Sequence, residues 1–151
     1  MDKKRILIPG GKTSDWPLIE AAHKLGMYVI TSGRDSKAFA HKYADEYVCV
    51  DYSNKEAMLQ MAKEKKIDYM CSSSNDIALT TTAYVCEQMG LPGHDGFETT
   101  LTLHHKDKFK ALSRKLKLHV PDGEYFTDEE SAVEYAKTID YKVMVKPVDL
   151  V

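Results

Sequence analysis

The stretch RILIPGGKTSDWPLIEAAHKLGMYVITSG, residues 5–33, places a helical pattern between two short apolar runs. The runs 5–10 and 27–33 have the solid apolar centres of strands that are buried on both faces. The segment between them predicts a helix over Asp15–Leu25, because its apolar residues fall on one helical face and Gly26 is placed to end it. A strand, a helix and a strand in this order predict a parallel sheet with a crossover connection.

The same alternation continues for about ninety residues. Two further apolar runs, EYVCVD at 46–51 and DYMCSS at 68–73, predict a third and a fourth strand. Three helices are expected with them: 37–43, 53–66 and 75–90. The fold class that follows is α/β, a small open parallel sheet of the Rossmann-like kind, and we predict it as a domain over residues 1–92.

The character of the sequence changes at LPGHDG, residues 91–96, where two glycines and a proline interrupt the alternation. The pattern after it predicts a basic helix, an interrupted strand, a second helix and a closing strand, over Lys106–Leu118, 120–126, 127–139 and Tyr141–Val148. These elements are too few to enclose a good core alone. We predict them to form a partial α+β subdomain over residues 93–151.

Capping boxes mark the starts of two of these helices. Ser53 lies three residues before Glu56, and Thr127 lies three residues before Glu130. At this separation each side chain can bond the backbone amide of the other residue. We therefore expect Ser53 and Thr127 to begin their helices.

Composition excludes several classes of function. The 151 residues carry 21 basic and 23 acidic side chains, so the net charge of -2 favours neither nucleic acid nor an anionic membrane as a partner. The three cysteines form no CxxC pair, and the adjacent His104 and His105 lack ligand partners at metal-binding spacing, so we expect no metal site. No signal peptide or membrane-length apolar run is present, which predicts a soluble, cytoplasmic protein.

The loop PGGKTSD, residues 9–15, invites comparison with phosphate-binding loops. A Walker A loop needs a glycine where Ile6 stands, and the dinucleotide fingerprint GxGxxG is absent as well. Two interpretations stay open for Gly10 and Gly11. Either they let the backbone approach a ligand near a helix N-terminus, or they only make a tight turn between strand and helix.

Polar residues follow the fourth predicted strand. Asn75 and Asp76 would project into the crevice at the carboxyl ends of the strands and could hold a polar substrate there. Equally, Asn75 could be a helix cap and Asp76 a first-turn acid favoured by the helix dipole. Arg34 and Asp35 follow the second strand, where a nucleotide-dependent reductase would recognise the ribose or its phosphate, although solvated loop charges are the simpler interpretation.

Lys146 stands inside the apolar run YKVMVKPV, between Val145 and Pro147. A cation there must reach water or meet an anion, and the missing amide of Pro147 ends regular pairing beside it. Such a lysine is a natural phosphate ligand, and a plain edge-strand lysine that discourages aggregation is the alternative.

The run from Gly90 to Asp149 resembles the first ATP-binding subdomain of the ATP-grasp superfamily. Its features are an aspartate-lysine pair at Asp107 and Lys108 that begins a basic helix, a "VP" strand, a capped helix and an apolar strand ending in "VKP". The first ninety residues resemble the pre-ATP-grasp domain that precedes it. Similar arrangements occur in carbamoyl-phosphate synthetase large subunits, biotin carboxylase, purine-pathway carboxylate ligases and D-alanine:D-alanine ligase.

The resemblance implies roles for two lysines. Lys108 and Lys146 would contact the phosphates of ATP, and the cofactors would be ATP and magnesium, with the magnesium ligands expected beyond Val151. No catalytic residue follows from the match. The parent enzyme would activate a small carboxylate as an acyl phosphate and couple it to an amine or another nucleophile, whereas the chain alone is expected to be inactive. A homodimer is left open.

The resemblance also gives positions for substrate binding. Gly10, Gly11, Asn75 and Asp76 occupy places where related enzymes bind the carboxylate-side substrate, although GGKTSD departs from the substrate loops of the family. Two alternatives remain. One is a non-catalytic anion-binding or assembly domain of a multi-part synthetase, and the other is an NADP-binding reductase based on Arg34.

Overall fold

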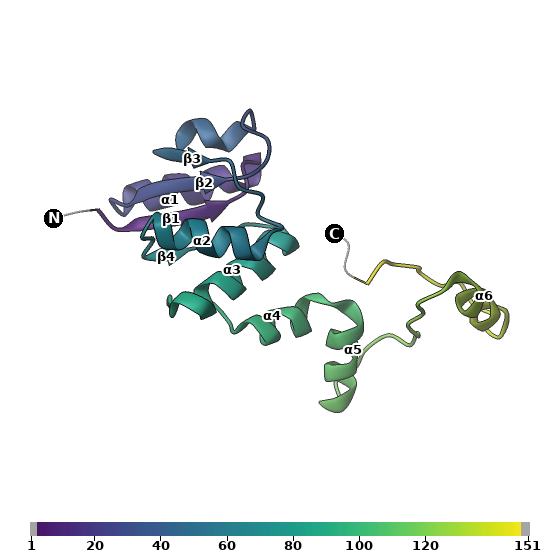
Figure 1. Ribbon diagram of the computed structural model, residues 1–151. Helices are drawn as coiled ribbons and strands as arrows, with labels where there is room; N and C mark the ends of the chain where they lie inside the picture. The colour runs from purple at the N-terminus through teal and green to yellow at the C-terminus, as the bar shows by residue number, and fades with distance from the viewer. Residues whose placement is uncertain (1–2, 149–151) are drawn as a thin grey trace. The chain divides into compact units, whose positions relative to one another are not determined.

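The computed structural model describes residues 3–148, which fall into two units, one extending to Thr100 and the other starting at Leu101 (Figure 1). The second predicted subdomain extends to residue 151, and residues 149–151 lie outside the described range. No helix of the described part is long and apolar enough to cross a membrane.

The first unit is built on a parallel sheet of four strands in the order β3-β2-β1-β4. The strands are β1 Arg5–Pro9, β2 Tyr28–Ser32, β3 Glu46–Val48 and β4 Tyr69–Met70. The helical segments are η1 Thr13–Asp15, α1 Trp16–Lys24, η2 Phe39–Tyr43, α2 Lys55–Glu64 and α3 Asp76–Met89. The predicted α/β fold with a parallel sheet is confirmed.

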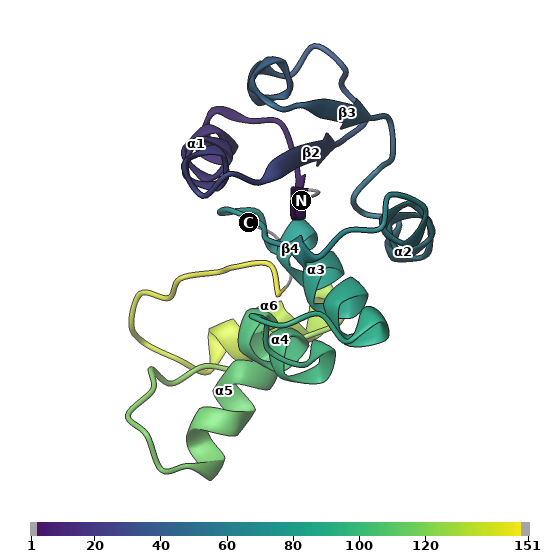
Figure 2. The same ribbon diagram turned by 90° about the vertical axis from the view of Figure 1, so that its left-hand side faces the viewer.

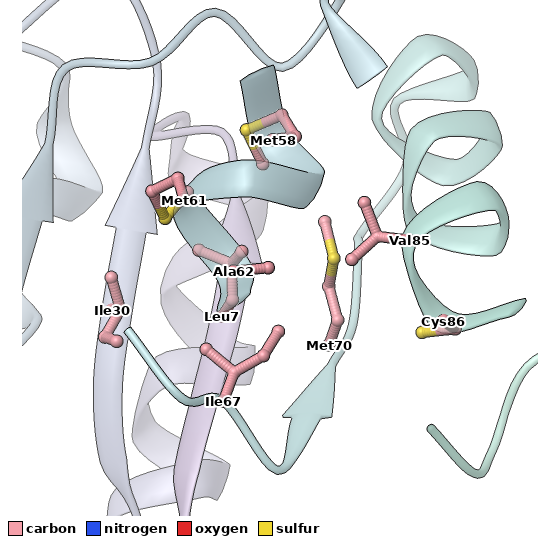
Figure 3. Packing of buried hydrophobic residues seen from close by; sticks show 9 residues of the cluster. All are labelled: Leu7, Ile30, Met58, Met61, Ala62, Ile67, Met70, Val85 and Cys86. Carbon is pink, nitrogen blue, oxygen red and sulfur yellow. The ribbon is translucent and has the colours of Figure 1, made fainter. Parts of the chain in front are cut away.

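Both faces of the sheet are covered, because successive side chains of a strand point to opposite faces. Leu7 of β1 packs into a cluster with residues of α2 and α3 (Figure 3), whereas the next residue, Ile8, packs against Ile19 and Ala22 of α1. Figure 2 shows α1 on one side of the strands and α2 on the other. This double burial explains why the centres of β1 and β2 appear in the sequence as apolar runs.

The starts of the helices differ from the predicted ones in their caps. Asn54, not Ser53, caps α2, and its side chain accepts a hydrogen bond from the amide of Ala57 at 3.0 Å. The predicted helix over 37–43 is a five-residue 3-10 helix, η2, and the first helix begins one residue later than expected, after the turn η1. Short polar side chains cap equally well, so spacing alone does not choose between neighbours.

The second unit holds the helices α5 Lys106–Lys115 and α6 Glu129–Lys137, and α4 Phe97–His104 spans the boundary between the units. Asp128, not Thr127, caps α6. Helix α4 was not expected, because its paired threonines are weak helix formers that follow a glycine-rich turn.

The two strands predicted for the second unit are absent. The structure gives 120–126 and 141–148 no strand within the described residues, and the side chain of Val145 is 88% exposed. Apolar alternation favours a strand only when a neighbouring strand is available to complete the backbone hydrogen bonds. The described part of this unit supplies none, so the prediction of strands here was wrong for the chain by itself.

Four helices end in the same hydrogen-bonded turn. After α1 and α3 its left-handed residue is a glycine, Gly26 with φ of 76° and Gly90 with φ of 63°. After α2 the same position is Lys66, with φ of 50°, and after α5 it is Lys117, with φ of 56°. In α2 the amide of Ile67 donates to the carbonyl of Ala62 at 3.3 Å, which is the closing bond of this motif. A lysine at this position carries the strain of a left-handed backbone.

We expect Lys66→Gly to raise the free energy of unfolding by about 0.5–1 kcal/mol, because glycine removes the left-handed strain at a modest entropic cost. Lys63→Gly, inside the last turn of the same helix, is the matched control and should lower it by about 1 kcal/mol. Urea titrations followed by circular dichroism measure both. A loss of stability in Lys66→Gly would contradict the explanation.

Candidate functional site

The candidate site lies where the order of the strands reverses. From β1 the chain proceeds outward to β2 and β3, and it then crosses back to place β4 on the other side of β1. The loops after β1 and β4 therefore leave neighbouring strands at the same edge of the sheet. In open parallel sheets a ligand usually binds at this edge, beside the reversal of the strand order.

Asp15 ties these two loops together. Its side chain is buried, with 2% of the residue exposed, and its Oδ2 atom accepts a hydrogen bond from the amide of Lys12 at 2.7 Å. Its Oδ1 atom accepts a hydrogen bond from the hydroxyl of Ser73, which lies in the loop after β4. The hydroxyl of Ser14 lies 3.4 Å from that of Ser73. Sequence positions 58 residues apart thus form one polar cluster at the reversal point.

The two glycines of the first loop are required by their packing. Gly10 has φ of 120°, and a Cβ atom added to it would lie 2.6 Å from Oδ2 of Asp15. A Cβ atom on Gly11 would lie 2.4 Å from Nε2 of His41 and 2.8 Å from Cβ of Ala38. These contacts give a structural reason for both glycines. Whether these glycines also let the backbone approach a ligand stays a prediction.

His41 supports the loop from the side. The residue is 8% exposed, its Nδ1 atom lies 2.9 Å from Oγ1 of Thr31, and its ring centroid lies 4.3 Å from that of Tyr47. The hydroxyl of Tyr47 donates to the carbonyl of Gly33 at 2.7 Å. Burial lowers the pKa of His41, although the backbone carbonyl and the carboxylate of Asp35 act in the opposite direction. The neutral imidazole is therefore the form that this packing favours.

The loop after β4 uses one predicted residue as a cap. The side-chain oxygen of Asn75 accepts from the amide of Ala78 at 3.0 Å, and its Nδ2 atom donates to the hydroxyl of Tyr52 at 3.2 Å. Asp76 lies in the first turn of α3. Within the described residues the hydroxyl of Ser72 is buried without a hydrogen-bond partner. Burying such a hydroxyl costs free energy unless another group bonds it. Ser72 is therefore a better candidate than Asn75 for binding a polar ligand.

Lys108 and Lys146 both lie in the second unit, and both side chains are exposed. Lys108 is in the first turn of α5, and Lys146 is in the extended segment 141–148. The amide of Lys106 donates to the carbonyl of Val148 at 3.2 Å, so the end of this segment is attached to the start of α5. That contact links the backbones that carry the two lysines. Their contact with phosphates stays a prediction.

The remaining predictions from the sequence concern Arg34 and metal ligands. Arg34 is 82% exposed and forms an ion pair with Asp51 at 3.4 Å, as expected of a solvated loop charge. No group of three or more His, Cys, Asp or Glu side chains in residues 3–148 could hold a metal ion.

Sequence reasoning missed Asp15, Ser73 and His41 as parts of the site. Asp15 was considered only as the start of the first predicted helix, and the hydroxyl that it bonds, that of Ser73, lies 58 positions away in the sequence. Their position in the sequence could have indicated Asp15 and Ser73. Both follow the end of a strand closely, and in the order β3-β2-β1-β4 the ends of β1 and β4 are neighbours at one edge of the sheet.

Comparison with known proteins supports the resemblance to ATP-grasp enzymes. No protein-family model matches the chain. The formate-dependent phosphoribosylglycinamide formyltransferase of Prochlorococcus marinus strain MIT 9303 is 27% identical over 146 residues, which cover 96% of this chain and 37% of the relative.

Two solved structures have a similar fold. Phosphoribosylglycinamide synthetase from Anaerococcus prevotii superposes with a TM-score of 0.75 and 23% identity, over 93% of this chain and 36% of that one. The second is the biotin carboxylase domain dimer of 2-oxoglutarate carboxylase from Hydrogenobacter thermophilus, in complex with the magnesium salt of ADP and bicarbonate. It superposes with a TM-score of 0.71 and 22% identity, over 91% of this chain and 33% of that one.

The resemblance to the amino-terminal region of the ATP-grasp superfamily is thereby confirmed. The chain spans a little over a third of the length of the curated relatives that it matches. The likeness to the solved structures, at this level of identity, concerns the fold.

We expect Asp15→Asn to lower the free energy of unfolding by about 1–3 kcal/mol, because the amide cannot accept both hydrogen bonds of the buried carboxylate. Ser73→Ala should cost about 1 kcal/mol, and the double variant should cost less than the sum. The fluorescence of Trp16, the only tryptophan, follows unfolding beside the cluster. Ser14→Ala is the control and should change little. Strictly additive losses would show that Asp15 and Ser73 do not interact.

The stability of the first unit should depend on pH through His41. Because its folded pKa lies below the ordinary value of about 6.5, the folded state binds fewer protons, and its contribution is present above that value and is lost as pH falls below it. Urea titrations at several values between pH 7.5 and 5 give the free energy of unfolding as a function of pH. This free energy should fall less steeply with falling pH in His41→Gln than in the unchanged protein. An equal slope in both proteins would contradict the burial argument.

Proposed function

We propose that this chain forms the amino-terminal part of an ATP-grasp ligase, in which ATP activates a small carboxylate as an acyl phosphate and an amine or another nucleophile displaces the phosphate. The observation that carries the proposal is the continuous match to such enzymes over 96% of the chain, which includes both units. The domain division at residues 92 and 93 is part of the proposal.

In this proposal the first unit binds the acid. The crevice between the loops after β1 and β4 holds it, with Gly10 and Gly11 on one side and Asn75 and Asp76 on the other. The buried carboxylate of Asp15 does not contact the substrate. It fixes the distance between the two loops, so that the buried hydroxyl of Ser72 meets a polar substrate atom in a preorganised site.

The second unit contributes positive charge. Lys108 and Lys146 bind the phosphates of ATP and balance the charge that develops as the phosphoryl group moves to the carboxylate. ATP as the cofactor agrees with the ADP complex of the biotin carboxylase neighbour. Magnesium would offset the negative charge of the phosphates in such an enzyme. By the resemblance to ATP-grasp enzymes, we propose that its ligands lie beyond Val151.

The remaining parts of the proposal concern the partners, the location and the oligomeric state. The partners are a small carboxylate and a nucleophile, with no role for nucleic acid or a membrane, and the proposed location is the cytoplasm. A homodimer is also part of the proposal, and the dimer of the biotin carboxylase neighbour supports it.

A non-catalytic anion-binding or assembly domain is the second candidate. It is favoured by the finding that Gly10, Gly11 and Asn75 each have a packing or capping role that needs no ligand. Calorimetry with Mg-ATP on the 151-residue chain tests what the chain binds alone. We expect weak binding or none, because only the lysine side of a nucleotide site is proposed here. Micromolar binding would contradict this expectation.

We expect Lys108→Ala and Lys146→Ala each to lower ATP-dependent turnover by about 100-fold in the full-length product of the gene that encodes this chain, since each removes a donor to a charged transition state. Lys142→Ala, in the same extended segment as Lys146, is the matched control and should keep its activity. Phosphate release in the presence of candidate acids measures the rate. Full activity in both lysine variants would overturn the assignment.

A further inference from the structure

A cavity in the first unit lies beside β2 and β3, not between the loops that form the candidate site. Strand β3 is at one edge of the sheet and β4 at the other (Figure 2). The loop after β2, the helix η2 and one side chain of β3 enclose a volume of about 510 Å³. This volume lies within the range of small-molecule sites, about 300–1,000 Å³. We call this cavity the η2 pocket, and the residues of its lining that matter here are Ser36, Lys37, Phe39, His41, Lys42 and Tyr47.

The walls of the η2 pocket are fixed by contacts within the first unit. The ring of Tyr47 packs on that of His41, with 4.3 Å between the ring centroids, and its hydroxyl donates to the carbonyl of Gly33 at 2.7 Å. The amide of Ala40 in η2 donates to the carbonyl of Gly11 at 2.8 Å. Contacts that need no ligand therefore shape the pocket, which lowers the entropic cost of binding one.

The η2 pocket has positive charge without a counter-charge. Lys37 and Lys42 are its cations, and none of the described residues that line it is acidic. Burial lowers the pKa of His41, so this ring stays mostly uncharged near pH 7. The carboxylate of Asp35 accepts a hydrogen bond from the amide of Lys37 at 2.9 Å and is not part of the lining. A concave surface with two cations and no acid attracts an anion.

Three donor groups of the pocket are available to such an anion. In the described part of the chain, the hydroxyl of Ser36 and the ammonium group of Lys37 have no hydrogen-bond or ion-pair partner. The ammonium group of Lys42 lies 4.4 Å from the ring centroid of Phe39 and 4.9 Å from that of Tyr43. These rings hold the cation in place and leave N–H groups that can still donate to an anion.

We infer that the η2 pocket binds the phosphate monoester of a small organic molecule. Lys37, Lys42 and Ser36 hold the phosphate, and the organic part lies against Ala38 and Phe39 in the remaining volume. A phosphate monoester carries nearly two negative charges at pH 7 and three acceptor oxygens. It therefore matches two cations and a hydroxyl better than a carboxylate does, which has one charge and two oxygens. This inference does not rest on the proposed function.

The η2 pocket is separate from the candidate site, but both are in contact with the same histidine. The ring of His41 lines the pocket, and its Nε2 atom would lie 2.4 Å from a Cβ atom on Gly11. Helix η2 is also bonded to the loop after β1 through the amide of Ala40. A ligand that stabilises η2 therefore also stabilises this hydrogen bond, and the exchange rate of the Ala40 amide reports it.

The experiment titrates the 151-residue chain with phenyl phosphate at about pH 7.5, where this probe is a dianion. Nuclear magnetic resonance of the backbone amides follows binding. We expect saturable shifts at residues 36–42 and slower hydrogen exchange of the Ala40 amide. Benzyl alcohol, which has the ring without the phosphate, should not bind. Inorganic phosphate should bind at least about threefold more weakly than phenyl phosphate, because it buries no apolar surface.

Substitutions in the lining test the assigned donors. Lys37→Gln and Lys42→Gln should each weaken the binding of phenyl phosphate about tenfold, because each removes a charge-assisted donor. Ser36→Ala should weaken it about threefold. Lys24→Gln, at an exposed lysine near the end of α1 and outside the lining, is the matched control and should bind like the unchanged protein. Circular dichroism checks that each variant is folded.

Three results would overturn the inference. These are shifts at 36–42 that do not saturate, folded Lys37→Gln and Lys42→Gln variants that bind as tightly as Lys24→Gln, and inorganic phosphate that binds as tightly as phenyl phosphate. The last result would show that the organic part is not bound. The assay contains neither ATP nor a candidate acid, so its outcome is independent of whether the full-length protein turns over ATP.

Discussion

The buried carboxylate of Asp15 is the constraint on which the candidate site depends. A carboxylate with 2% exposure is stable only when its oxygens are bonded, and here the amide of Lys12 and the hydroxyl of Ser73 bond them. Because these donors belong to the loops after β1 and β4, satisfying one buried charge also sets the separation of the two loops. The close contact of Asp15 with Gly10 follows from the same arrangement.

The architecture of the first unit could be predicted because its signals are local. Leu7 and Ile8 both had to be apolar once each faced a different layer, and this double burial is visible as an unbroken run in the sequence. The strand order and the role of Asp15 could not be predicted in this way. The hydrogen bond between Asp15 and Ser73 joins residues 58 positions apart, and no spacing rule connects them. Nor could spacing decide between Ser53 and Asn54 as a cap, because each side chain can accept a hydrogen bond from the amide three residues further along the chain.

The second unit shows the opposite relation between sequence and structure. Its helices were predicted because they close their hydrogen bonds within the segment, whereas the strands over 120–126 and 141–148 depend on partners elsewhere. The alternation around Val145 was correctly identified, but a pattern states what a segment can pair with and not whether the partner is present. In the described residues no strand pairs with this segment, and Val143, Met144 and Val145 are exposed.

The two units therefore differ in what stabilises them. The first unit buries its clusters within residues 6–91, and Asp15 joins the loops after β1 and β4, so contacts within that unit fix the arrangement of these loops. The segment that carries Lys146 leaves Val143, Met144 and Val145 exposed, and its end is held by the hydrogen bond from Lys106 to Val148. Of the two places at which we propose binding, the loops of the first unit are therefore better preorganised than the segment of Lys146.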